Sequence, residues 1–469
     1  MIVFDAFPTI SLLNARKRID AVRYPTFARL AADAIWYPNA TTSLDETGRA
    51  FRSIFTGRTS WRWVKPNYGN FPNNLFTLLG RRYRVEASEE VTSFCPKRLC
   101  PDVRPQTRRS IEDSLTAGRS ERFVSWLEGF APSRRPTFYF KHALLPHTPL
   151  TYLPDGRTYY DGPSEQNAWS WDDWHTNPWL IQQTYQRHLL QLEFTDHLVG
   201  RVLDQLKAQG LYDRSLIVVT ADHGEMFGRP GKTREIDRRT AAEIGLKPMF
   251  VKLPFQRSGR IDPRYVRNVD ILPTIARVAR LRPNWRVEGH PMFGPEARRI
   301  PRSILFFRRS GQRIQVSPKW LSRRVAASLR LKLKLFGAGN TSGLYAIGPH
   351  RELHGTAVTR WPALPASALR AQLDNLQRYR DVRLDSPTAP VKVSGRLSGP
   401  GSQAPRNVAV AVNGTIVATA PALAANGGSG RLLSVMIPES SLVEGANTLQ
   451  LFAIEGGRGA PALRPLGGT

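Results

Sequence analysis

Short apolar runs alternate with longer helical patterns through the first 295 residues of the chain. Residues 216–219 form a continuous β-branched run, which is typical of a central parallel strand covered on both faces. From Pro178 to Gly210, apolar residues recur at the spacing of one helix face, and Gly210 can end that helix. This alternation predicts an α/β fold with a doubly wound, mostly parallel sheet.

The same periodicities predict the other elements of this part of the chain. Strands are expected at residues 2–4, 34–37, 83–87 and 248–254, with a strand-to-loop transition over 137–149, and helices are expected at 24–33, 50–55, 73–79, 111–130 and 268–279.

The pattern changes beyond residue 297. Residues 329–335 alternate strictly between Leu and a cationic residue, which predicts a strand with one apolar and one cationic face. Short β-branched runs after residue 391, with the hairpin signal Asn413-Gly414, predict a small all-β sandwich. The expected parts are a catalytic α/β domain at 1–297, a connecting region of short strands and helices at 298–390, and a β-sandwich-like domain at 391–469.

The chain is strongly basic. It has 67 Lys and Arg against 38 Asp and Glu, a net charge of +29, which favours anionic partners. Most of the excess positive charge comes from Arg residues scattered singly or in pairs, which fits a general bias in composition equally well. The sequence shows no zinc-finger spacing, aromatic RNA-binding signature or basic tail, so we expect an anionic substrate and no nucleic acid.

Two further features concern the compartment. Cys95 and Cys100 are each followed by Pro, which predicts a small disulfide in an oxidising compartment, with a reduced pair as the alternative.

No apolar run approaches the ~20 residues of a membrane span. Because the sequence begins almost inside a strand, we expect membrane association through an upstream segment that is not in this chain.

Acidic residues lie at the carboxyl ends of two predicted strands. Asp222 and His223 follow residues 216–219, and Asp5 follows residues 2–4. Ligands of open α/β sheets gather at this edge, so these residues suggest a metal or phosphate site. A turn or capping role is the alternative for the Asp-His pair taken alone.

A threonine hydroxyl lies before one predicted helix, and two histidines follow one predicted strand. Thr47 lies in a hydroxyl-rich loop before a short helix, where it is either a cap or a nucleophile whose phosphoryl ester the helix N–H groups would hold. His142 and His147 follow the strand that begins near residue 137. They can contact a metal or donate to a phosphoryl oxygen or leaving group, with a structural role as the alternative.

A basic loop follows the Asp-His pair. Arg229, Lys232 and Arg234 could clamp an anion, and solvated loop charge is the alternative.

Several of these motifs together resemble the sulfatase-like branch of the alkaline phosphatase superfamily. The matching elements are Asp5, Thr47 with Thr56-Gly57-Arg58, Leu145-Pro-His147-Thr-Pro, the run from Thr220 to Glu225, and Asp270-Ile-Leu-Pro-Thr, which cover residues 1 to about 295. The chain looks closest to bacterial membrane-anchored sulfatase-like proteins, and it is more distantly similar to phosphoethanolamine and phosphoglycerol transferases. This resemblance implies a location at the extracytoplasmic face of a bacterial membrane or in the periplasm.

The resemblance implies a site with one divalent ion: zinc, manganese, calcium or magnesium. The implied metal ligands are Asp5, Thr47, Asp222 and His223. Thr47 would also be the catalytic nucleophile, forming a phospho-threonine. His147, perhaps with His142 and Lys232, would bind the substrate's non-bridging oxygens, and His147 could also protonate the leaving group.

Departures from the family pattern restrict the ester chemistry and the number of metal ions that the resemblance implies. Sulfatases carry Cys or Ser in a Cys-x-Pro-x-Arg motif, whereas this chain has Thr47-Gly-Arg-Ala-Phe51, so phosphate esters are favoured over sulfate esters. Ala6 stands where many relatives have an acid, and Arg52 where close relatives have Pro, which leaves at best a single-metal site.

The sequence therefore predicts a metal-dependent hydrolase or transferase acting on phospho- or sulfo-esters of an anionic cell-envelope substrate. The alternative is a non-catalytic envelope binding protein that kept the fold with a degraded metal site.

Overall fold

The chain forms two compact units in the computed structural model, which describes residues 1–102, 107–160, 168–231, 233–297, 300–404, 406–424, 431–457 and 460–468. One unit comprises residues 1–150, 195–226 and 232–331, and the other comprises residues 151–194, 227–231 and 332–469. The domain boundaries predicted at residues 297 and 390 stay predictions.

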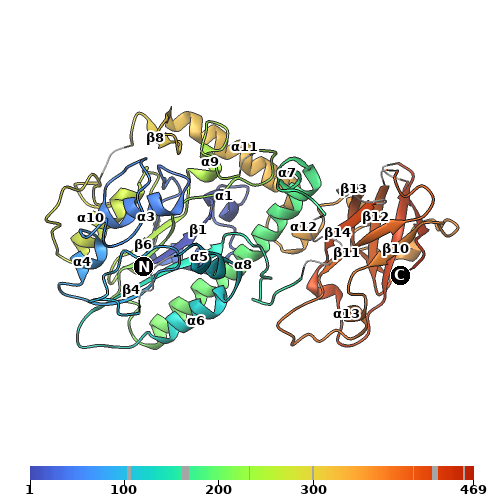
Figure 1. The fold of residues 1–469 in the computed structure, drawn as a ribbon, viewed down its shortest axis with the longest axis horizontal. Helices are drawn as coiled ribbons and strands as arrows, with labels where there is room; N and C mark the ends of the chain where they lie inside the picture. Colours follow the sequence, from blue (N-terminus) through green and yellow to red (C-terminus); the bar gives the residue numbers. More distant parts are fainter. Residues whose placement is uncertain are drawn as a thin grey trace. The chain divides into compact units, whose positions relative to one another are not determined.

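The first unit is built around a seven-stranded sheet in the order β3-β4-β1-β5-β6-β2-β7. Three of these strands, β1, β4 and β6, are labelled in Figure 1. Its strands are β1 (Ile2–Asp5), β2 (Ile35–Trp36), β3 (Arg84–Ser88), β4 (Thr137–Pro146), β5 (Ile217–Ala221), β6 (Met249–Lys252) and β7 (Arg260–Ile261). β3, β4, β1 and β5 are mutually parallel, and β6 is antiparallel to both of its neighbours. The predicted α/β fold with a mostly parallel sheet is confirmed.

Helices lie around this sheet at most of the predicted positions. Those of the first unit are α1 (Thr9–Leu12), α2 (Pro25–Asp33), α3 (Thr47–Thr56), α4 (Leu75–Leu79), α5 (Arg108–Thr116), α6 (Arg119–Glu128), α9 (Ala241–Ile244), η2 (Asn268–Asp270) and α10 (Ile271–Val278). The single helical region predicted at 111–130 is two helices, because Gly118 adopts a left-handed φ of 63° between them.

An aromatic cluster fixes α3 on the sheet. The ring centroid of Phe55 lies 4.7 Å from that of Phe76 on α4 and 5.2 Å from that of Phe140 on β4. Phe51, one turn earlier on α3, packs with its ring centroid 4.4 Å from that of His142. This packing holds the first turn of α3 above the carboxyl ends of the central strands.

The strand predicted at residues 329–335 is wrong. These residues belong to helix α11 (Pro318–Phe336). Leu, Lys and Arg are all good helix formers, so their strict alternation does not by itself select a strand. Leu329 and Phe336, which are seven residues apart and therefore share a helix face, are both buried.

The second unit contains the predicted all-β region, which is confirmed. Its seven strands are antiparallel in the order β10-β11-β14-β13-β12-β15-β16, and the hairpin between β12 and β13 turns at Asn413 and Gly414, both with positive φ. The strands are β10 (Arg370–Leu373), β11 (Lys392–Ser398), β12 (Arg406–Val412), β13 (Thr415–Ala424), β14 (Arg431–Met436), β15 (Leu449–Glu455) and β16 (Ala462–Pro465).

The remaining elements are shorter or pass between the units along the chain. They are α7 (Trp171–Thr176), α8 (Pro178–Ala208), β8 (Ile304–Phe307), β9 (Arg313–Val316), α12 (Ser342–Tyr345), η3 (Arg351–Leu353), η4 (Val358–Arg360), α13 (Gln377–Arg380) and η5 (Glu439–Ser441). Cys95 and Cys100 form the predicted disulfide. Within the described residues, no helix has the length and apolar character needed to cross a membrane.

A buried carboxylate on α8 caps the start of α2, and its removal is expected to destabilise the first unit. Asp196 accepts the N–H groups of Thr26 at 3.0 Å and Phe27 at 2.7 Å, while the N-cap residue Tyr24 makes no side-chain cap. Asp196→Ala leaves both donors buried and should lower the free energy of unfolding by about 2 kcal/mol in chemical denaturation.

Asp204 on the same helix is the matched control. Its carboxylate pairs with Arg29 at 3.1 Å in an exposed position, so Asp204→Ala should change stability by about 0.5 kcal/mol or less. Equal effects of the two substitutions would contradict the capping role of Asp196.

Candidate active site

Two acidic residues meet at the carboxyl ends of adjacent strands. β1 and β5 pair in parallel with Phe4 opposite Ala221, so the next residues along the two strands, Asp5 and Asp222, are neighbours. The backbone N–H of Asp222 donates to the Phe4 carbonyl at 3.0 Å, and the N–H of Ala6 donates to Asp222 Oδ1 at 3.4 Å. Both carboxylates are buried.

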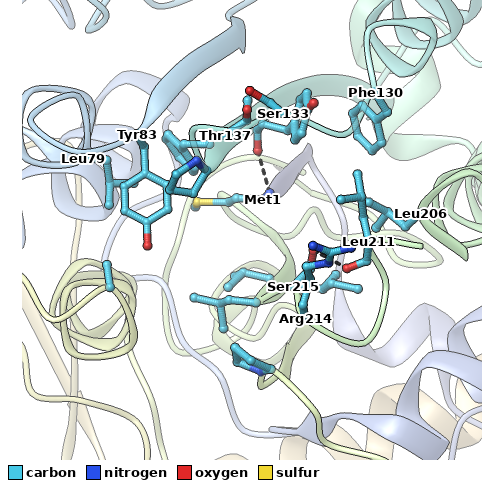
Figure 2. A pocket seen from close by; sticks show the side chains of 18 of the residues that line it. Met1, Leu79, Tyr83, Phe130, Ser133, Thr137, Leu206, Leu211, Arg214 and Ser215 are labelled. Atoms are coloured by element: carbon cyan, nitrogen blue, oxygen red, sulfur yellow. Dashed lines mark hydrogen bonds between the residues drawn. The ribbon is translucent and has the colours of Figure 1, made fainter. Parts of the chain in front are cut away.

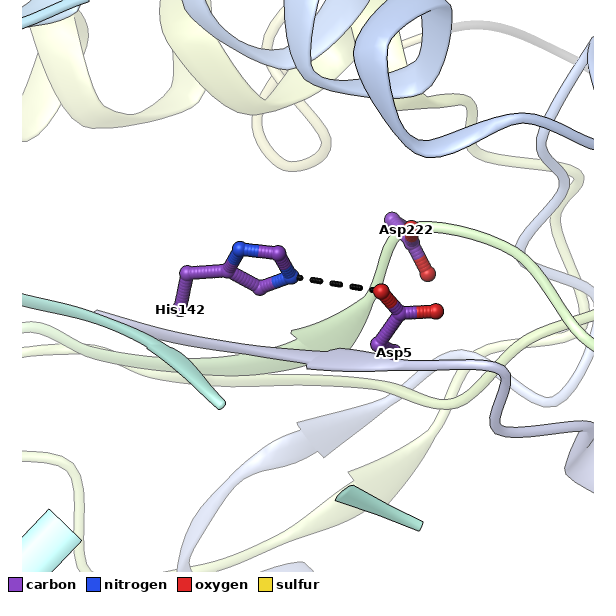
Figure 3. Close-up of side chains that lie close together, drawn as sticks. All are labelled: Asp5, His142 and Asp222. Carbon is purple, nitrogen blue, oxygen red and sulfur yellow. Dashed lines mark ion pairs between the residues drawn. The ribbon is translucent and has the colours of Figure 1, made fainter. Parts of the chain in front are cut away.

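His142 joins this pair from β4. Val3 of β1 pairs with His142, which brings its Nε2 to 3.6 Å from Asp5 Oδ2 (Figure 3). One ligand atom from each of Asp5, His142 and Asp222 lies within 4.8 Å of the others, so these three residues could hold a metal ion. The sequence analysis assigned His142 to substrate binding, whereas its position beside Asp5 favours a metal ligand.

The donor atoms themselves suit a cation. Among the described residues, Asp5 Oδ1, Asp222 Oδ2 and both ring nitrogens of His142 are buried and have no hydrogen-bond partner. Buried carboxylate oxygens without partners are destabilising, and a divalent ion with oxygen and imidazole ligands would satisfy them. The residues present therefore fit such an ion.

His223 lies beside the same carboxylates. Its Nε2 is 3.4 Å from Asp222 Oδ2 and 4.0 Å from Asp5 Oδ1, and its Nδ1 lies 2.8 Å from the Gly224 carbonyl oxygen. A proton on Nδ1, donated to that carbonyl, leaves a lone pair on Nε2 facing the site. Burial, with the adjacent positive charge of Arg234, lowers the pKa of His223 to about 3, so the imidazole is neutral as a metal ligand must be.

The two carboxylates differ in their affinity for protons. Burial and the negative charge of Asp5 raise the pKa of Asp222 well above its usual value. Burial alone would raise the pKa of Asp5 too, but His147, the other histidines and Arg234 hold it below its usual value. Like charges in one buried site separate the two pKa values in this way, and a bound cation would relieve the repulsion.

Thr47 is placed at the first residue of α3, facing Asp5. Its hydroxyl donates to Asp5 Oδ2 at 3.3 Å. The capping alternative does not apply, because the N-cap is Glu46, whose carboxylate accepts the N–H of Gly48 at 3.2 Å. The hydroxyl of Thr47 therefore points to the acidic pair rather than to its own helix.

Arg234 is one of the three loop cations that the sequence offers as a possible anion clamp, with solvated loop charge as the alternative. Its Nη1 contacts Nε2 of His147, and its Nη2 lies 3.0 Å from Nε2 of His223, so the guanidinium links the two imidazoles. Of these three cations the sequence favours Lys232 for substrate binding, and Lys232 lies outside the described residues. No local pattern separates Arg234 from the solvated cations around it.

Two further residues fix the backbone of the site by hydrogen bonds to its carbonyl groups. Arg119, which is buried, donates from Nη1 to the His147 carbonyl at 2.8 Å and from Nη2 to the Pro149 carbonyl at 2.5 Å. Asn268 donates from Nδ2 to the Asp222 carbonyl at 3.0 Å. These bonds fix the backbone of His147 and Asp222.

A separate cavity of about 480 Å³ lies at the opposite edge of the sheet (Figure 2). It is lined by the first residues of β1, β4 and β5, and the ammonium group of Met1 donates there to the Tyr139 carbonyl at 2.8 Å. None of the residues described above lines it, so it is not part of the candidate active site.

Comparison with known proteins places this site in a family context. A family model described as Sulfatase matches residues 18–281. An ulvan-active sulfatase of Formosa agariphila is 27% identical over 101 residues, which cover 21% of this chain and 20% of that protein. The low-salt glycan biosynthesis sulfotransferase Agl7 of Haloferax volcanii is 27% identical over 145 residues, which cover 30% of this chain and 32% of that protein.

A solved structure shares the fold. BT4656, in complex with its substrate D-glucosamine-2-N,6-O-disulfate, has a TM-score of 0.52 at 14% identity, over 69% of this chain and 92% of that chain. The matches to the two curated relatives thus span about a third or less of their lengths.

Neutralising Asp222 is expected to abolish metal binding without loss of stability. Asp222→Asn keeps the oxygen that accepts two backbone N–H groups and removes the repulsion with Asp5, so the metal-free variant should be at least as stable as the wild type. Added manganese should stabilise only the wild type, by about 2.7 kcal/mol at about 100 times its dissociation constant, measured by thermal unfolding.

Asp262→Asn controls for the loss of a buried carboxylate elsewhere. Asp262 accepts from Arg264 Nε at 2.8 Å, remote from Asp222 in the chain, so this variant should keep the response to manganese. An unchanged manganese response in Asp222→Asn would show that Asp222 is not a ligand.

Proposed function

The chain belongs to the sulfatase family, and from this premise we propose that it cleaves anionic esters of a cell-envelope saccharide or lipid, with Thr47 as the nucleophile. Phosphate esters are the favoured substrates, with sulfate esters second. The observation on which the proposal rests is the Thr47 hydroxyl, directed at buried Asp5 beside Asp222 and Arg234.

The substrate's anionic group would bind between Thr47 and Arg234. A guanidinium presents several N–H donors in one plane, which suits the oxygens of a phosphate or sulfate. The first turn of α3 adds the partial positive charge of a helix N-terminus beside Thr47. The names of the relatives support an anionic saccharide substrate, since they act on ulvan, on a glucosamine disulfate or in glycan biosynthesis.

Attack by Thr47 would proceed by in-line displacement. A bond forms from Oγ1 to phosphorus, and the hydroxyl proton, which Thr47 donates to Asp5 Oδ2 before the attack, passes to water. The bond from phosphorus to the leaving oxygen breaks, and that oxygen takes up a proton from His147 or water. A divalent ion held by Asp5, Asp222 and His142 or His223 would lower the pKa of the hydroxyl and neutralise charge on the transferring group.

His147 must change partners to act as this proton donor. Its Nε2 contacts Nη1 of Arg234, and its Nδ1 contacts the Thr148 carbonyl oxygen, so both ring nitrogens are engaged. An anion that draws the N–H groups of Arg234 toward itself would free Nε2 for protonation. Arg234 would thereby couple substrate binding to the acid role of His147.

The second step decides between hydrolysis and transfer. Water, or an acceptor hydroxyl, attacks the phosphorus of phospho-Thr47, and the bond to Oγ1 breaks to restore the threonine. The disulfide between Cys95 and Cys100 supports an oxidising compartment, and we place the reaction in the periplasm or at the extracytoplasmic face of a membrane.

Ala6 favours the second candidate, a non-catalytic envelope binding protein. It lies next to Asp5 with a φ of 57°, a strained conformation for Ala, and it brings no carboxylate to the site. Metal-loaded wild type that binds but does not turn over phosphate or sulfate esters would support this candidate.

Substitution of Thr47 tests the nucleophile. With 4-nitrophenyl phosphate, Thr47→Ala should lower kcat at least about 1,000-fold, whereas Thr47→Ser, which keeps a hydroxyl, should stay within about tenfold. Mass spectrometry of acid-quenched wild type should find a phosphoryl group on the peptide that contains Thr47. Full activity in Thr47→Ala would remove Thr47 from the mechanism.

A further inference from the structure

A cavity of about 530 Å³ adjoins the loop that leads to Thr47. It is lined by Ser43 from this loop, by Trp61 and Arg62 beyond the end of α3, and by Leu305, Phe307 and Arg313 from the β8–β9 hairpin. These side chains are distinct from those of the candidate active site.

The hairpin presents two different faces. Pairing of β8 with β9 places Ile304 opposite Val316 and Phe307 opposite Arg313. Ile304, Phe306, Ile314 and Val316 are buried in an apolar cluster, so the alternate residues Leu305, Phe307 and Arg313 face the cavity. Leu305 is 40% exposed and gives the cavity an apolar surface.

Trp61 forms an aromatic wall of the cavity. It is 39% exposed, and the turn of the hairpin lies against its ring. A Cβ on Gly311, where φ is 89°, would come within 2.8 Å of a ring carbon of Trp61. The glycine therefore permits the close approach that fixes the orientation of the indole.

Arg62 and Arg313 differ from the other charged residues at the cavity. Arg267 pairs with Asp270 at 3.0 Å, and the carboxylate of Glu288 accepts the N–H of Thr59 at 3.0 Å. In the part of the chain that the structure describes, no carboxylate lies within ion-pair distance of Arg62 or Arg313, and both are exposed. The cavity thus combines an apolar aromatic surface with two guanidinium groups, of which that of Arg62 lies over the Trp61 ring, with its Cζ 5.5 Å from the ring centroid.

One network ties the cavity to the candidate active site. The N–H of Phe307 donates to the Ser43 carbonyl at 2.8 Å. Arg309, in the hairpin turn, donates from Nε to Asp45 at 3.2 Å and from Nη2 to the Arg234 carbonyl at 3.2 Å. Ser43 is four residues from Thr47, so their Cα atoms are at most about 14 Å apart.

We propose that this cavity is a saccharide subsite, which stacks a sugar ring on Trp61 and binds its sulfate, phosphate or carboxylate with Arg62 and Arg313. The apolar face of a pyranose suits an exposed indole, and a guanidinium binds each of these anions through paired hydrogen bonds. The inference rests on the proposed function, since the bound sugar would adjoin the ester cleaved at Thr47. The substrate is therefore an anionic oligosaccharide rather than a simple phosphate ester.

Binding of a heparin-derived hexasaccharide to the full chain, measured by calorimetry, tests the subsite. Trp61→Ala and Arg313→Ala should each weaken binding about tenfold or more. Trp63→Ala and Arg302→Ala are the matched controls, because both residues are exposed nearby but do not line the cavity, and they should stay within about twofold. A neutral oligosaccharide of equal length should bind more weakly than the sulfated one.

The outcomes separate the subsite from the catalytic proposal. Equal losses in the Arg313 variant and the Arg302 control would mean diffuse charge attraction and would overturn the subsite, as would unchanged affinity in Trp61→Ala. Oligogalacturonate that binds in place of the heparin hexasaccharide would assign the anion as carboxylate, whereas binding of neither would overturn the proposal. Trp61→Ala should also keep the wild-type kcat on 4-nitrophenyl phosphate, because this substrate carries no saccharide that could bind in the cavity.

Discussion

The structure of the site depends on two carboxylates buried together where neighbouring parallel strands end. The register of β1 and β5 brings Asp5 and Asp222 side by side. Their backbones are held in this position by the pairing of the two strands. Buried like charges repel each other, and the cationic and imidazole groups around the two carboxylates offset this repulsion. A divalent ion would complete this compensation.

The surrounding elements place each partner of that acidic pair. The aromatic packing of α3 on β4 holds Thr47 against Asp5, and β4 itself brings His142 beside β1. Arg234 arrives from a loop, between His147 and His223. The site is thus assembled from four separate stretches of chain on one rigid sheet edge, which is a suitable support for precise positioning of a reacting group.

Sequence patterns predict the parts of this site that follow directly from strand ends. Asp5, Asp222 and His223 each come after a recognisable strand, and the resemblance adds Thr47. The role of His142 depends instead on the pairing of β4 with β1, and Arg234 depends on the path of an irregular loop. Neither leaves a periodic signal. Residues 329–335 show the opposite case, since they have a clear period-2 alternation but lie in a helix, because Leu, Lys and Arg suit helix and strand alike.

The central claim is that the buried acidic pair holds a metal beside Thr47. Crystals of the protein grown with manganese and inorganic phosphate would test it through anomalous scattering. The account predicts one manganese peak bonded to carboxylate oxygens of Asp5 and Asp222, with phosphate in contact with Arg234 and Thr47. Manganese bound only elsewhere, with Asp5 and Asp222 unliganded, would contradict it.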